Sequence, residues 1–481
     1  MLTRLKVSGF KNLVDTEIRF GPFTCIAGYN GVGKSNVFDA IRFLSLLADH
    51  TFIDAARKTR GGTDAANLFT LGGDGVMSLD CDLIVPGRGH DDFHQPAEAS
   101  HTFLNYQLEL GLTHDERGLE RIELRREQLT YVTQGEANRR LGFDTKREWR
   151  ESVIRKSNRR AAYIETIEAD GLTRIRLSTD KMREQSKSKR GGGRPSDFLA
   201  TSLPRTALSA AQNADEARTA VLVRAEMRSW RILQLEPSAL RLPDDLQAPT
   251  MLTVEGHHLP ATLYRMASGP DGERIVAEIS NRLAQLVDDV REVRVVRDDA
   301  RRLLQLVLTD TSGREFAASS LSDGTLRFIA LSVFERNSET TGLLCLEEPE
   351  NGIHPERVGA MMSLLRDMAT DTAEPVDAWN PLRQVIVSTH SPVVVAHTAP
   401  GDLVFADHRD APRTPGSRRA LALRPCPKAW RAKDSDVSPV GKGEIISYLG
   451  ALEPKREGVD HQQETTFDLV AEQLSLFGSE R

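Results

Sequence analysis

Cysteine is scarce in this chain and is not spaced for metal or redox chemistry. The 481 residues contain four cysteines and no C-x-x-C pair. Cys25 and Cys345 lie in apolar runs typical of strands, while Cys81 and Cys426 stand alone. We expect buried free thiols in a reducing compartment, which excludes a small disulfide-stapled secreted domain.

Long apolar runs are also missing. No run approaches the roughly 18 residues that suggest a membrane-spanning helix. The first residues, MLTRLKVSGFKNL, alternate like a strand and lack the apolar block of a signal peptide. We therefore expect a cytoplasmic protein with no membrane partner.

Net positive charge is lacking, and lysine is rare. The formal net charge is −6, so no global positive field points to nucleic acid. Only 13 of the 63 basic residues are lysine, and the other 50 are arginine. Arginine suits bidentate phosphate contacts, but a biased genome composition explains the same excess. Internal repeats and heptads are absent as well, which excludes a long coiled coil.

The strongest motif present is a phosphate-binding loop. An apolar run over 23–27 leads into GYNGVGKS, a complete G-x-x-x-x-G-K-S, and a helical pattern follows. The glycines allow backbone N–H groups to point at a β-phosphate, Lys34 adds charge near a γ-phosphate, and Ser35 supplies a Mg²⁺ ligand. We expect the helix to bury one side, made of Val37, Phe38, Ile41, Phe43, Leu44 and Leu47.

Two later motifs indicate which kind of nucleotide site this is. The run GLLCLEEPENGIHPE is an apolar strand ending in Glu347 and Glu348. One carboxylate there suits a Mg²⁺ shell and the next suits polarising the attacking water. The run QVIVSTHSPVVV is a second strand, and His390 after it can reach a γ-phosphate. Between the P-loop and these strands, Ser322 is placed to cap a helix, and Gly324 permits close approach of its backbone to a ligand.

The order of these motifs resembles ATP-binding-cassette (ABC) ATPases of the SMC and RecF type. More narrowly, it resembles the OLD-like (overcoming lysogenisation defect) ATPases of bacterial anti-phage systems. The matching segments are VSGFKNL, GYNGVGKSN, LSDGTLR, LLCLEEPENGIHP and STHSP. The resemblance implies an α/β P-loop NTPase with an ABC-type head, in which a mixed central sheet, an antiparallel side sheet and a helical lobe carrying the signature motif come together.

The resemblance also implies roles for single residues. Glu348 would be the catalytic base and His390 the γ-phosphate sensor. Ser35 and, through water, Glu347 would hold Mg²⁺. The nucleotide would contact Gly28, Asn30, Gly31, Gly33, Lys34, Ser35, Asn36 and Lys11. Ser322 and Gly324 would contact the ATP of another subunit, which implies a homodimer enclosing two ATPs.

The chain departs from the family pattern in three ways. Glu347 stands where many relatives have Asp, and the longer side chain still permits a water-mediated Mg²⁺ contact. The glutamine that usually follows the first strands has only Gln107 and Gln128 as candidates, and both lie in ordinary strand patterns. The Toprim nuclease of many OLD-like proteins is missing, because the DSD at 434–436 follows no apolar strand. We therefore expect any nuclease or toxin to be a separate partner.

The motif order divides the chain into four parts. An N-terminal ATPase lobe spans 1–206 and contains a basic insertion at 139–194, a helical region spans 207–292, a C-terminal ATPase lobe spans 293–400, and an extension with an acidic tail spans 401–481. Periodicity predicts strands at 3–8, 16–20, 23–27 and near 293–309, and helices at 207–235, 272–292, 322–336 and 355–369.

Residues 139–194 hold seventeen basic residues against eight acidic ones. A flexible arginine- and glycine-rich loop neutralises phosphates without reading sequence, so duplex DNA is one candidate partner. The alternative is a solvated insertion in an arginine-rich protein.

The last residues contain QLSLF. This segment, which includes Leu474, resembles the peptide by which bacterial replication and repair proteins bind the sliding clamp, with Leu476 and Phe477 as apolar anchors and Gln473 at the rim. The alternative is an amphipathic helix, because Phe467, Val470, Leu474 and Phe477 fall on one helical stripe.

Two functions follow. The first is an ATP-hydrolysing dimer that acts on or near DNA in anti-phage defence or genome maintenance, recruited to the sliding clamp. The second is a regulatory ATPase scaffold that holds or releases a partner nuclease or toxin without contacting DNA.

Overall fold

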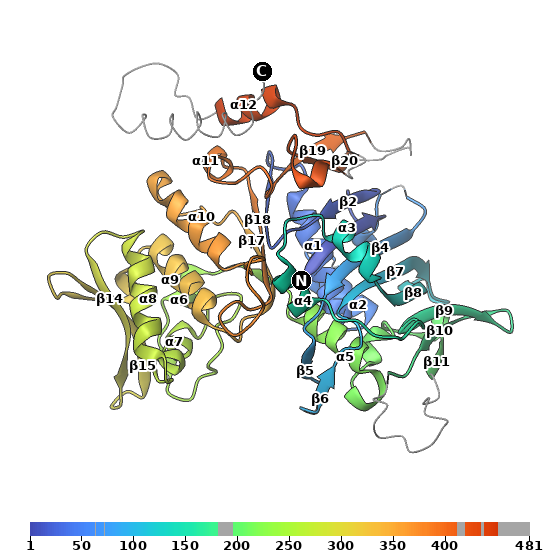
Figure 1. The fold of residues 1–481 in the computed structure, drawn as a ribbon, viewed down its shortest axis with the longest axis horizontal. Helices are drawn as coiled ribbons and strands as arrows, with labels where there is room; N and C mark the ends of the chain where they lie inside the picture. The colour runs from blue at the N-terminus through green and yellow to red at the C-terminus, as the bar shows by residue number, and fades with distance from the viewer. Residues whose placement is uncertain (63, 72, 181–195, 411–418, 434–436, 451–481) are drawn as a thin grey trace.

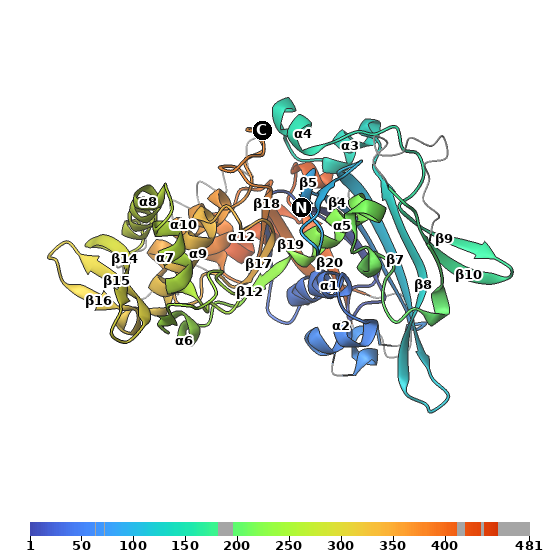
Figure 2. The ribbon, with the colours of Figure 1, turned by 90° about the horizontal axis from the view of Figure 1, so that it is seen from below.

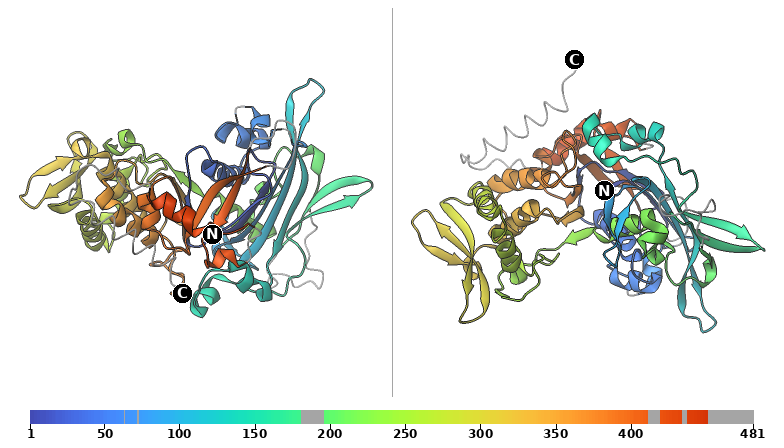
Figure 3. Two further views of the ribbon diagram at one scale, coloured as in Figure 1. Left: turned by 90° about the horizontal axis from the view of Figure 1, so that it is seen from above. Right: turned by 60° about the horizontal axis from the view of Figure 1, so that its bottom comes forward.

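In the computed structural model, a central sheet lies between two lobes (Figure 1). The structure describes residues 1–62, 64–71, 73–180, 196–410, 419–433 and 437–450. The N-terminal lobe carries a long antiparallel sheet, and the opposite lobe carries helices and a small sheet. Figure 2 shows these two sheets at opposite ends of the molecule, and Figure 3 shows the same separation from two further directions.

The central sheet is mixed and has six strands in the order β12-β17-β18-β3-β19-β20. Neighbouring strands are parallel except for β19 and β20, which are antiparallel. The strands are β3 (Phe23–Ala27), β12 (Arg231–Leu233), β17 (Gly342–Glu347), β18 (Arg383–Thr389), β19 (Leu403–Arg409) and β20 (Ala420–Pro425). Every residue of β3 and β18 is buried, which explains their continuous apolar runs.

The two faces of the central sheet belong to two different hydrophobic cores. Along β17, Leu343 and Cys345 pack into the core of the N-terminal lobe. Leu344 and Leu346 pack into the core of the helical lobe. This alternation follows from the two-residue period of a strand, and it gives each face of the sheet a separate core.

The side sheet of the N-terminal lobe has eight strands, all antiparallel, in the order β11-β10-β9-β8-β7-β4-β1-β2. They are β1 (Leu2–Ser8), β2 (Thr16–Arg19), β4 (Val76–Ile84), β7 (Phe103–His114), β8 (Glu120–Tyr131), β9 (Ile164–Ala169), β10 (Leu172–Leu177) and β11 (Ser196–Leu199). A separate hairpin consists of β5 (Arg88–His90) and β6 (Pro96–Glu98). The helices of this lobe are α1 (Lys34–Leu47), α2 (Phe52–Lys58), α3 (Gln134–Leu141), α4 (Arg147–Val153) and α5 (Ala214–Arg228).

The opposite lobe combines helices with a small antiparallel sheet. Its helices are α6 (Pro237–Leu240), α7 (Leu259–Ala267), α8 (Gly272–Ala284), α9 (Asp323–Arg336) and α10 (Val358–Asp367). Its strands are β13 (Asp244–Asp245), β14 (Val290–Asp298), β15 (Leu303–Asp310) and β16 (Glu315–Ala317). Two further helices complete the described chain. α11 (Pro392–Ala396) follows β18, which is called the switch strand below because it leads to His390, and α12 (Lys442–Gly450) follows β20. These layers confirm the expected ABC-type α/β head.

Three segments differ from the sequence-based expectation. Of the helix predicted over 207–235, the α-helix in the structure is α5, which ends at Arg228. The strand β12 follows it and joins the central sheet beside β17. The helix predicted over 272–292 ends at Ala284, because β14 begins at Val290. Residues 403–425, grouped above with the C-terminal extension, add two strands to the central sheet. In each case pairing between strands overrides the local pattern: β12 pairs with β17, β14 with β15, and β19 with β3.

Part of the basic segment at 139–194 is regular structure. Its described residues form α3, α4, β9 and β10, and the last two extend the side sheet. Residues 181–195, which include the densest basic run, lie outside the described residues.

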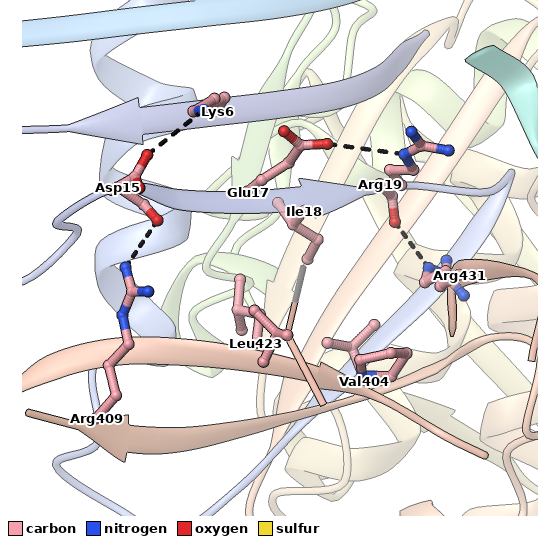
Figure 4. A pocket seen from close by; sticks show the side chains of 11 residues that line it. Lys6, Asp15, Glu17, Ile18, Arg19, Val404, Arg409, Leu423 and Arg431 are labelled. Carbon is pink, nitrogen blue, oxygen red and sulfur yellow. Dashed lines mark hydrogen bonds and ion pairs between the residues drawn. The ribbon is translucent and has the colours of Figure 1, made fainter. Parts of the chain in front are cut away.

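Arginine side chains close the junction between the two large sheets. Arg409 donates to the carbonyl of Asp15, and Arg431 donates to the carbonyl of Arg19, at 2.7 Å in each case (Figure 4). Both carbonyls belong to the edge of the side sheet around β2, while Arg409 ends β19 and Arg431 follows β20. Ile18 and Leu423 line the pocket between these strands. The arginines thus supply partners for carbonyls at a strand edge.

Candidate nucleotide-binding site

Three loops meet at one edge of the central sheet. The P-loop follows β3, Glu347 and Glu348 end or follow β17, and His390 follows β18. These strands are neighbours in the order β17-β18-β3 and run parallel, so their carboxyl ends lie side by side. Ligands of open parallel sheets bind at this edge, so the structure brings together the motifs that the sequence predicted.

The P-loop has a conformation that only its glycines permit. Gly31 has φ +79° and Gly33 has φ +108°, both in the left-handed region. A side chain at Gly33 would also collide with Asn12, since its Cβ would lie 2.3 Å from Nδ2. No atom lies within 4 Å of a Cβ built on Gly31, so this part of the loop opens onto free space.

The start of α1, the helix after the loop, has no side chain that caps it. Gly33 is the N-cap of α1 and makes no side-chain cap, so N–H groups of the first turn point into the loop without a capping oxygen. The predicted apolar side of α1 is buried. An anionic ligand suits this arrangement of orphan donors and helix dipole.

Lys34 lies within the loop. Its Nζ donates to the carbonyls of Gly28 at 2.6 Å and Tyr29 at 3.0 Å. Burial lowers the pKa of Lys34, although the carboxylates of Glu348 and other acids nearby oppose this change. The ammonium group therefore lies among P-loop carbonyls. It is also near the carboxylates of residues 347–350, at and after the end of β17, which are called the acidic loop below.

Asn30 and Asn36 differ in their surroundings. Asn30 is exposed on the loop. Asn36 donates to Asn12 at 2.7 Å, and Asn12 in turn donates to the carbonyl of Val32 at 3.1 Å. Asn36 is thus linked to the P-loop backbone through Asn12 in this structure.

The two predicted Mg²⁺ ligands are in contact with each other. The Ser35 hydroxyl hydrogen-bonds Glu347. Burial opposes ionisation of Glu347, but Arg60, Ser35 and Lys34 together outweigh burial and lower its pKa. Arg60 lies 2.8 Å from the Glu347 carboxylate. A hydroxyl beside an ionised carboxylate is a donor set that suits Mg²⁺.

Arg60 is a site residue that the sequence analysis missed. Besides Glu347, it contacts Asp39 on α1 at 3.1 Å and donates to the carbonyl of Ser35 at 3.3 Å. Lys11 joins the same group, because its Nζ lies 2.6 Å from both Asp39 and the carbonyl of Arg60. Lys11 was predicted to touch ATP, and here it is held beside the P-loop helix. The motif TRGG, a basic residue before two glycines, was the available signal.

Glu348 and His390 form a direct pair. His390 Nδ1 lies 2.6 Å from Oε1 of Glu348, and Asn351 donates to the other oxygen at 2.9 Å. Glu348 has φ +48°, a left-handed backbone rare for a residue with a side chain. Both side chains are part-exposed, as a group that meets a ligand must be. The structure thus brings together the two residues to which the sequence analysis gave the roles of base and sensor, a contact that it did not predict, and the roles themselves remain proposals.

The signature residues lie in the opposite lobe. Ser322 is exposed and caps α9, accepting from the N–H of Thr325 at 3.2 Å, which confirms the predicted cap. A Cβ at Gly324 would meet the carbonyl of Gly352 at 2.5 Å. Gly324 therefore packs on the loop after Glu348, and a larger residue there would displace one of the two segments.

A cleft of about 550 Å³ opens beside Glu347 and Glu348 and is lined by residues of both lobes. Asp39 and Arg60 line it from the N-terminal lobe, and Gln234, Arg327 and Glu348 also line it. Its walls are mostly charged or polar, unlike those of a site for an apolar molecule.

The glutamine candidates do not reach this site through their recorded contacts. Gln107 on β7 and Gln128 on β8 are cross-strand partners within the side sheet. Gln107 donates to Asn105 at 3.0 Å, and Gln128 accepts from Arg126 at 2.6 Å. Both are strand residues, as their sequence patterns indicated.

The C-terminal helix α12 contacts the P-loop from the other side. The rings of Tyr448 and Tyr29 lie edge to face with centroids 5.5 Å apart. Glu444 on the same helix pairs with Arg424 of β20 at 2.9 Å. A cavity of about 310 Å³ lies between Gly28 and these residues. The sequence analysis did not predict this contact, because α12 is separated from the P-loop by most of the chain.

Several basic residues of 139–180 have acidic or carbonyl partners within the molecule. Arg140 pairs with the buried Asp82 at 3.0 Å, and Arg159 donates to the carbonyl of Thr179 at 2.9 Å. Arg147, Arg155 and Arg176 pair with Glu151, Glu98 and Asp197. The positive charge of this segment is thus partly used to hold the side sheet and its neighbours.

Two of the predictions concern residues that the structure does not describe. The clamp-like residues Gln473, Leu474, Leu476 and Phe477 and the DSD at 434–436 lie outside the described residues. Within the described part, no helix combines the length and the apolar character needed to cross a membrane.

The chain matches two family models. The first, described as "AAA domain, putative AbiEii toxin, Type IV TA system", matches residues 128–396, more than half of the chain. The second, described as "AAA domain", matches residues 4–55, which include the P-loop.

Curated relatives are similar to only a short part of the chain. The chain is 33% identical over 84 residues to the DNA replication and repair protein RecF of Porphyromonas gingivalis, covering 16% of the chain and 23% of that protein. It is 41% identical over 51 residues to RecF of Parabacteroides distasonis, covering 10% and 14%. The chain thus spans about a quarter or less of the length of these relatives.

Solved structures with distant likeness are SMC heads. The SMC head domain from Thermotoga maritima has 12% identity and a TM-score of 0.37, covering 88% of this chain and 98% of that one. The SMC head bound to the C-winged helix domain of ScpA has 14% identity and a TM-score of 0.40, covering 88% and 97%.

The sheet order, the P-loop and the acidic strand end are those of an ABC-type ATPase, and more than half of the sequence matches one family model. The chain therefore belongs to the AAA-domain family of that model and has the α/β fold of an ABC-type P-loop NTPase head.

Proposed function

We propose that this protein hydrolyses ATP with Glu348 as the base and His390 as the sensor of the terminal phosphate. The observation that carries this proposal is the 2.6 Å contact between their side chains, at the strand edge that also bears the P-loop. A base and its orienting partner within hydrogen-bond distance are the usual mark of general-base chemistry.

The residues present fit ATP and Mg²⁺. The uncapped start of α1 and the left-handed glycines form an anion cradle, and Ser35 with Glu347 supplies hard oxygen donors. When bound, Mg²⁺ would supply electrostatic stabilisation to the phosphates.

The chain's own groups divide the remaining work. Lys34 carries positive charge into the P-loop, and Glu348 would accept a proton from the attacking water. His390 holds Oε1 of Glu348, and Asn351 holds Oε2, so the carboxylate is fixed in orientation before the substrate arrives. Such preorganisation is the main protein contribution in phosphoryl transfer.

We propose that Ser322 and Gly324 act on the ATP of a second subunit. Their described contacts are with α9 and with 352–353, in the lobe opposite the P-loop. An exposed serine at a helix start can offer its N–H groups to a phosphate. A homodimer enclosing two ATPs would bring each signature motif to its partner's P-loop.

The test combines turnover with oligomeric state. We expect Lys34→Ala to lose ATP binding, measured by calorimetry. We expect Glu348→Gln to bind ATP, to lose at least about 100-fold in turnover, and to remain dimeric in light scattering with ATP. Glu273→Gln, on the exposed face of α8, is the matched control and should behave as wild type. Wild-type turnover by Glu348→Gln would refute the assignment of the base.

We further propose that the ATP-bound dimer acts on or near duplex DNA, in bacterial anti-phage defence or genome maintenance. Similarity to RecF, named a DNA replication and repair protein, supports this setting. Residues 181–195 would supply phosphate contacts, and 473–477 would recruit the protein to the sliding clamp.

The DNA proposal predicts a steep dependence on salt. Glu348→Gln with ATP should bind duplex DNA, and affinity should fall strongly as salt rises, because bound phosphates release counterions. Deleting 181–194 should weaken binding and reduce the salt slope. No binding at low salt would refute direct DNA contact.

The second candidate is a regulatory scaffold that holds or releases a separate nuclease or toxin. Two observations favour it: arginines of 139–180 are already paired within the molecule, and the matched family model is described in terms of a toxin system. Co-purification of a neighbouring gene product, released by ATP, would support it. A DNA-stimulated ATPase would favour the first function.

A further inference from the structure

Glu350 is a third carboxylate in the acidic loop, two residues after Glu348. Its Oε1 accepts a hydrogen bond from the Thr389 hydroxyl at 2.5 Å. Thr389 is the last residue of β18 and immediately precedes His390. The acidic loop and the switch strand are therefore joined by two side-chain contacts, Glu348 with His390 and Glu350 with Thr389.

The Thr389 hydroxyl also holds the chain on the far side of His390. Its Oγ1 accepts a hydrogen bond from the N–H of Ser391 at 2.8 Å. One hydroxyl thus fixes both neighbours of His390, and Glu350 fixes that hydroxyl. A histidine ring is oriented by its backbone and by its ring partner, so these bonds set the direction from which His390 meets Glu348.

The second carboxylate oxygen of Glu350 lies in an unusual environment. Within the described residues, its Oε2 is buried and has no hydrogen-bond partner. Leaving a buried carboxylate oxygen unpaired costs free energy, and an orphan of this kind in a native fold calls for an explanation. Pro349 restricts the backbone directly before Glu350, so the carboxylate is held close to the switch strand.

We propose that Glu350 is a positioning residue for ATP hydrolysis: through Thr389 it holds the switch loop so that His390 stays paired with Glu348. This inference rests on the proposed function, since it assigns Glu350 a part in that reaction. Glu350 acts through Thr389 and is not itself expected to touch the nucleotide.

Kinetics of two substitutions at each position test the link. Glu350→Ala and Thr389→Val remove the hydrogen bond, whereas Glu350→Gln and Thr389→Ser keep an acceptor or a hydroxyl in place. We expect each disruptive variant to lower kcat about tenfold or more with KM changed less than about threefold, and each conservative variant to stay within about threefold of wild type. The double variant Glu350→Ala/Thr389→Val should be no slower than the slower single one.

A second readout does not require turnover. In protein labelled on histidine, the His390 imidazole signals, assigned with His390→Ala, should move in Glu350→Ala and Thr389→Val and stay in place in the conservative variants. If the wild type hydrolyses no ATP, the proposed function fails while these spectra still decide the positioning role. Unmoved signals in Glu350→Ala, or kinetic effects of the two disruptive substitutions that multiply, would overturn the proposal.

Discussion

At the scale of single residues, Arg60 connects the P-loop to the acidic strand end. It contacts Glu347 at 2.8 Å, Asp39 at 3.1 Å and the carbonyl of Ser35 at 3.3 Å. A planar guanidinium can serve all three, while an ammonium cannot. We expect Arg60→Ala to lower kcat/KM for ATP at least about tenfold and Arg60→Lys to be intermediate.

Steady-state hydrolysis and calorimetric ATP binding would measure this. Arg57→Ala, an exposed arginine in the same segment, is the control and should be silent. Equal activity of Arg60→Ala and wild type would show that Arg60 serves only the packing of the loop.

Also at residue scale, Glu127 makes stability depend on pH. It is fully buried on β8 and accepts from the N–H groups of Ala207 and Leu208 at 2.6 and 2.9 Å, and from Tyr106 at 3.1 Å. Burial raises its pKa to about 7, and these donors only partly offset burial. The folded state therefore binds the proton more tightly than the unfolded state does.

Stability should then fall as pH rises from about 4.5 to about 7, by about 3 kcal/mol in total. Thermal midpoints at several pH values across this window would show the slope. We expect Glu127→Gln to flatten it and Glu123→Gln, half-buried on the same strand, to leave it unchanged. An unaltered slope in Glu127→Gln would mean that other groups cause it.

At the scale of elements, Arg383 joins the end of α9, the helix that Ser322 caps, to the start of β18. It begins β18, is 1% exposed, and donates to the carbonyls of Glu335, Asn337 and Thr340 at 3.0, 3.0 and 2.7 Å. These carbonyls lie at or beyond the end of α9. Burial lowers the pKa of Arg383 to about 10, so it stays charged at neutral pH.

Removing this side chain would take the donor from the carbonyls of Glu335 and Thr340, and would leave Asn337 with the N–H of Thr340 as its donor. We expect Arg383→Ala to reduce the free energy of unfolding by about 3 kcal/mol or more, measured by urea denaturation. Arg301→Ala, on an exposed turn, should change it by less than about 0.5 kcal/mol. Equal stability of the two variants would contradict this role.

At the scale of the whole molecule, the strand that bears the P-loop needs the C-terminal part of the chain. β3 lies between β18 and β19, and β19 pairs with β20. A chain ending at residue 401 would expose one edge of β3 and one rim of each core. We expect this fragment to be insoluble or unfolded, because an open edge on a buried parallel strand has no substitute partner.

A chain ending at residue 450 keeps every described strand and helix. It should melt within a few degrees of the full-length protein, measured by differential scanning fluorimetry. Cooperative melting and ATP binding by the 1–401 fragment would show that the head is complete without β19 and β20.

Local patterns predicted the parts of the site that depend on neighbours in sequence. The P-loop turn, the buried side of α1 and the serine cap of α9 each involve residues within a few positions. Strands with continuous apolar runs, such as β17 and β18, were also predictable because a buried parallel strand has no polar face. Arg60, Asn12 and Glu350 were missed, since their partners lie in other segments of the chain.

The sequence by itself determined that this chain has the P-loop and the fold of an ABC-type head, because the motifs and their order are written in short contiguous runs. Only the tertiary structure decided that Glu348 pairs with His390, that Glu350 holds Thr389, and that arginines of the basic segment are already engaged. These contacts join residues tens of positions apart, and the side chains meet only after the strands have paired.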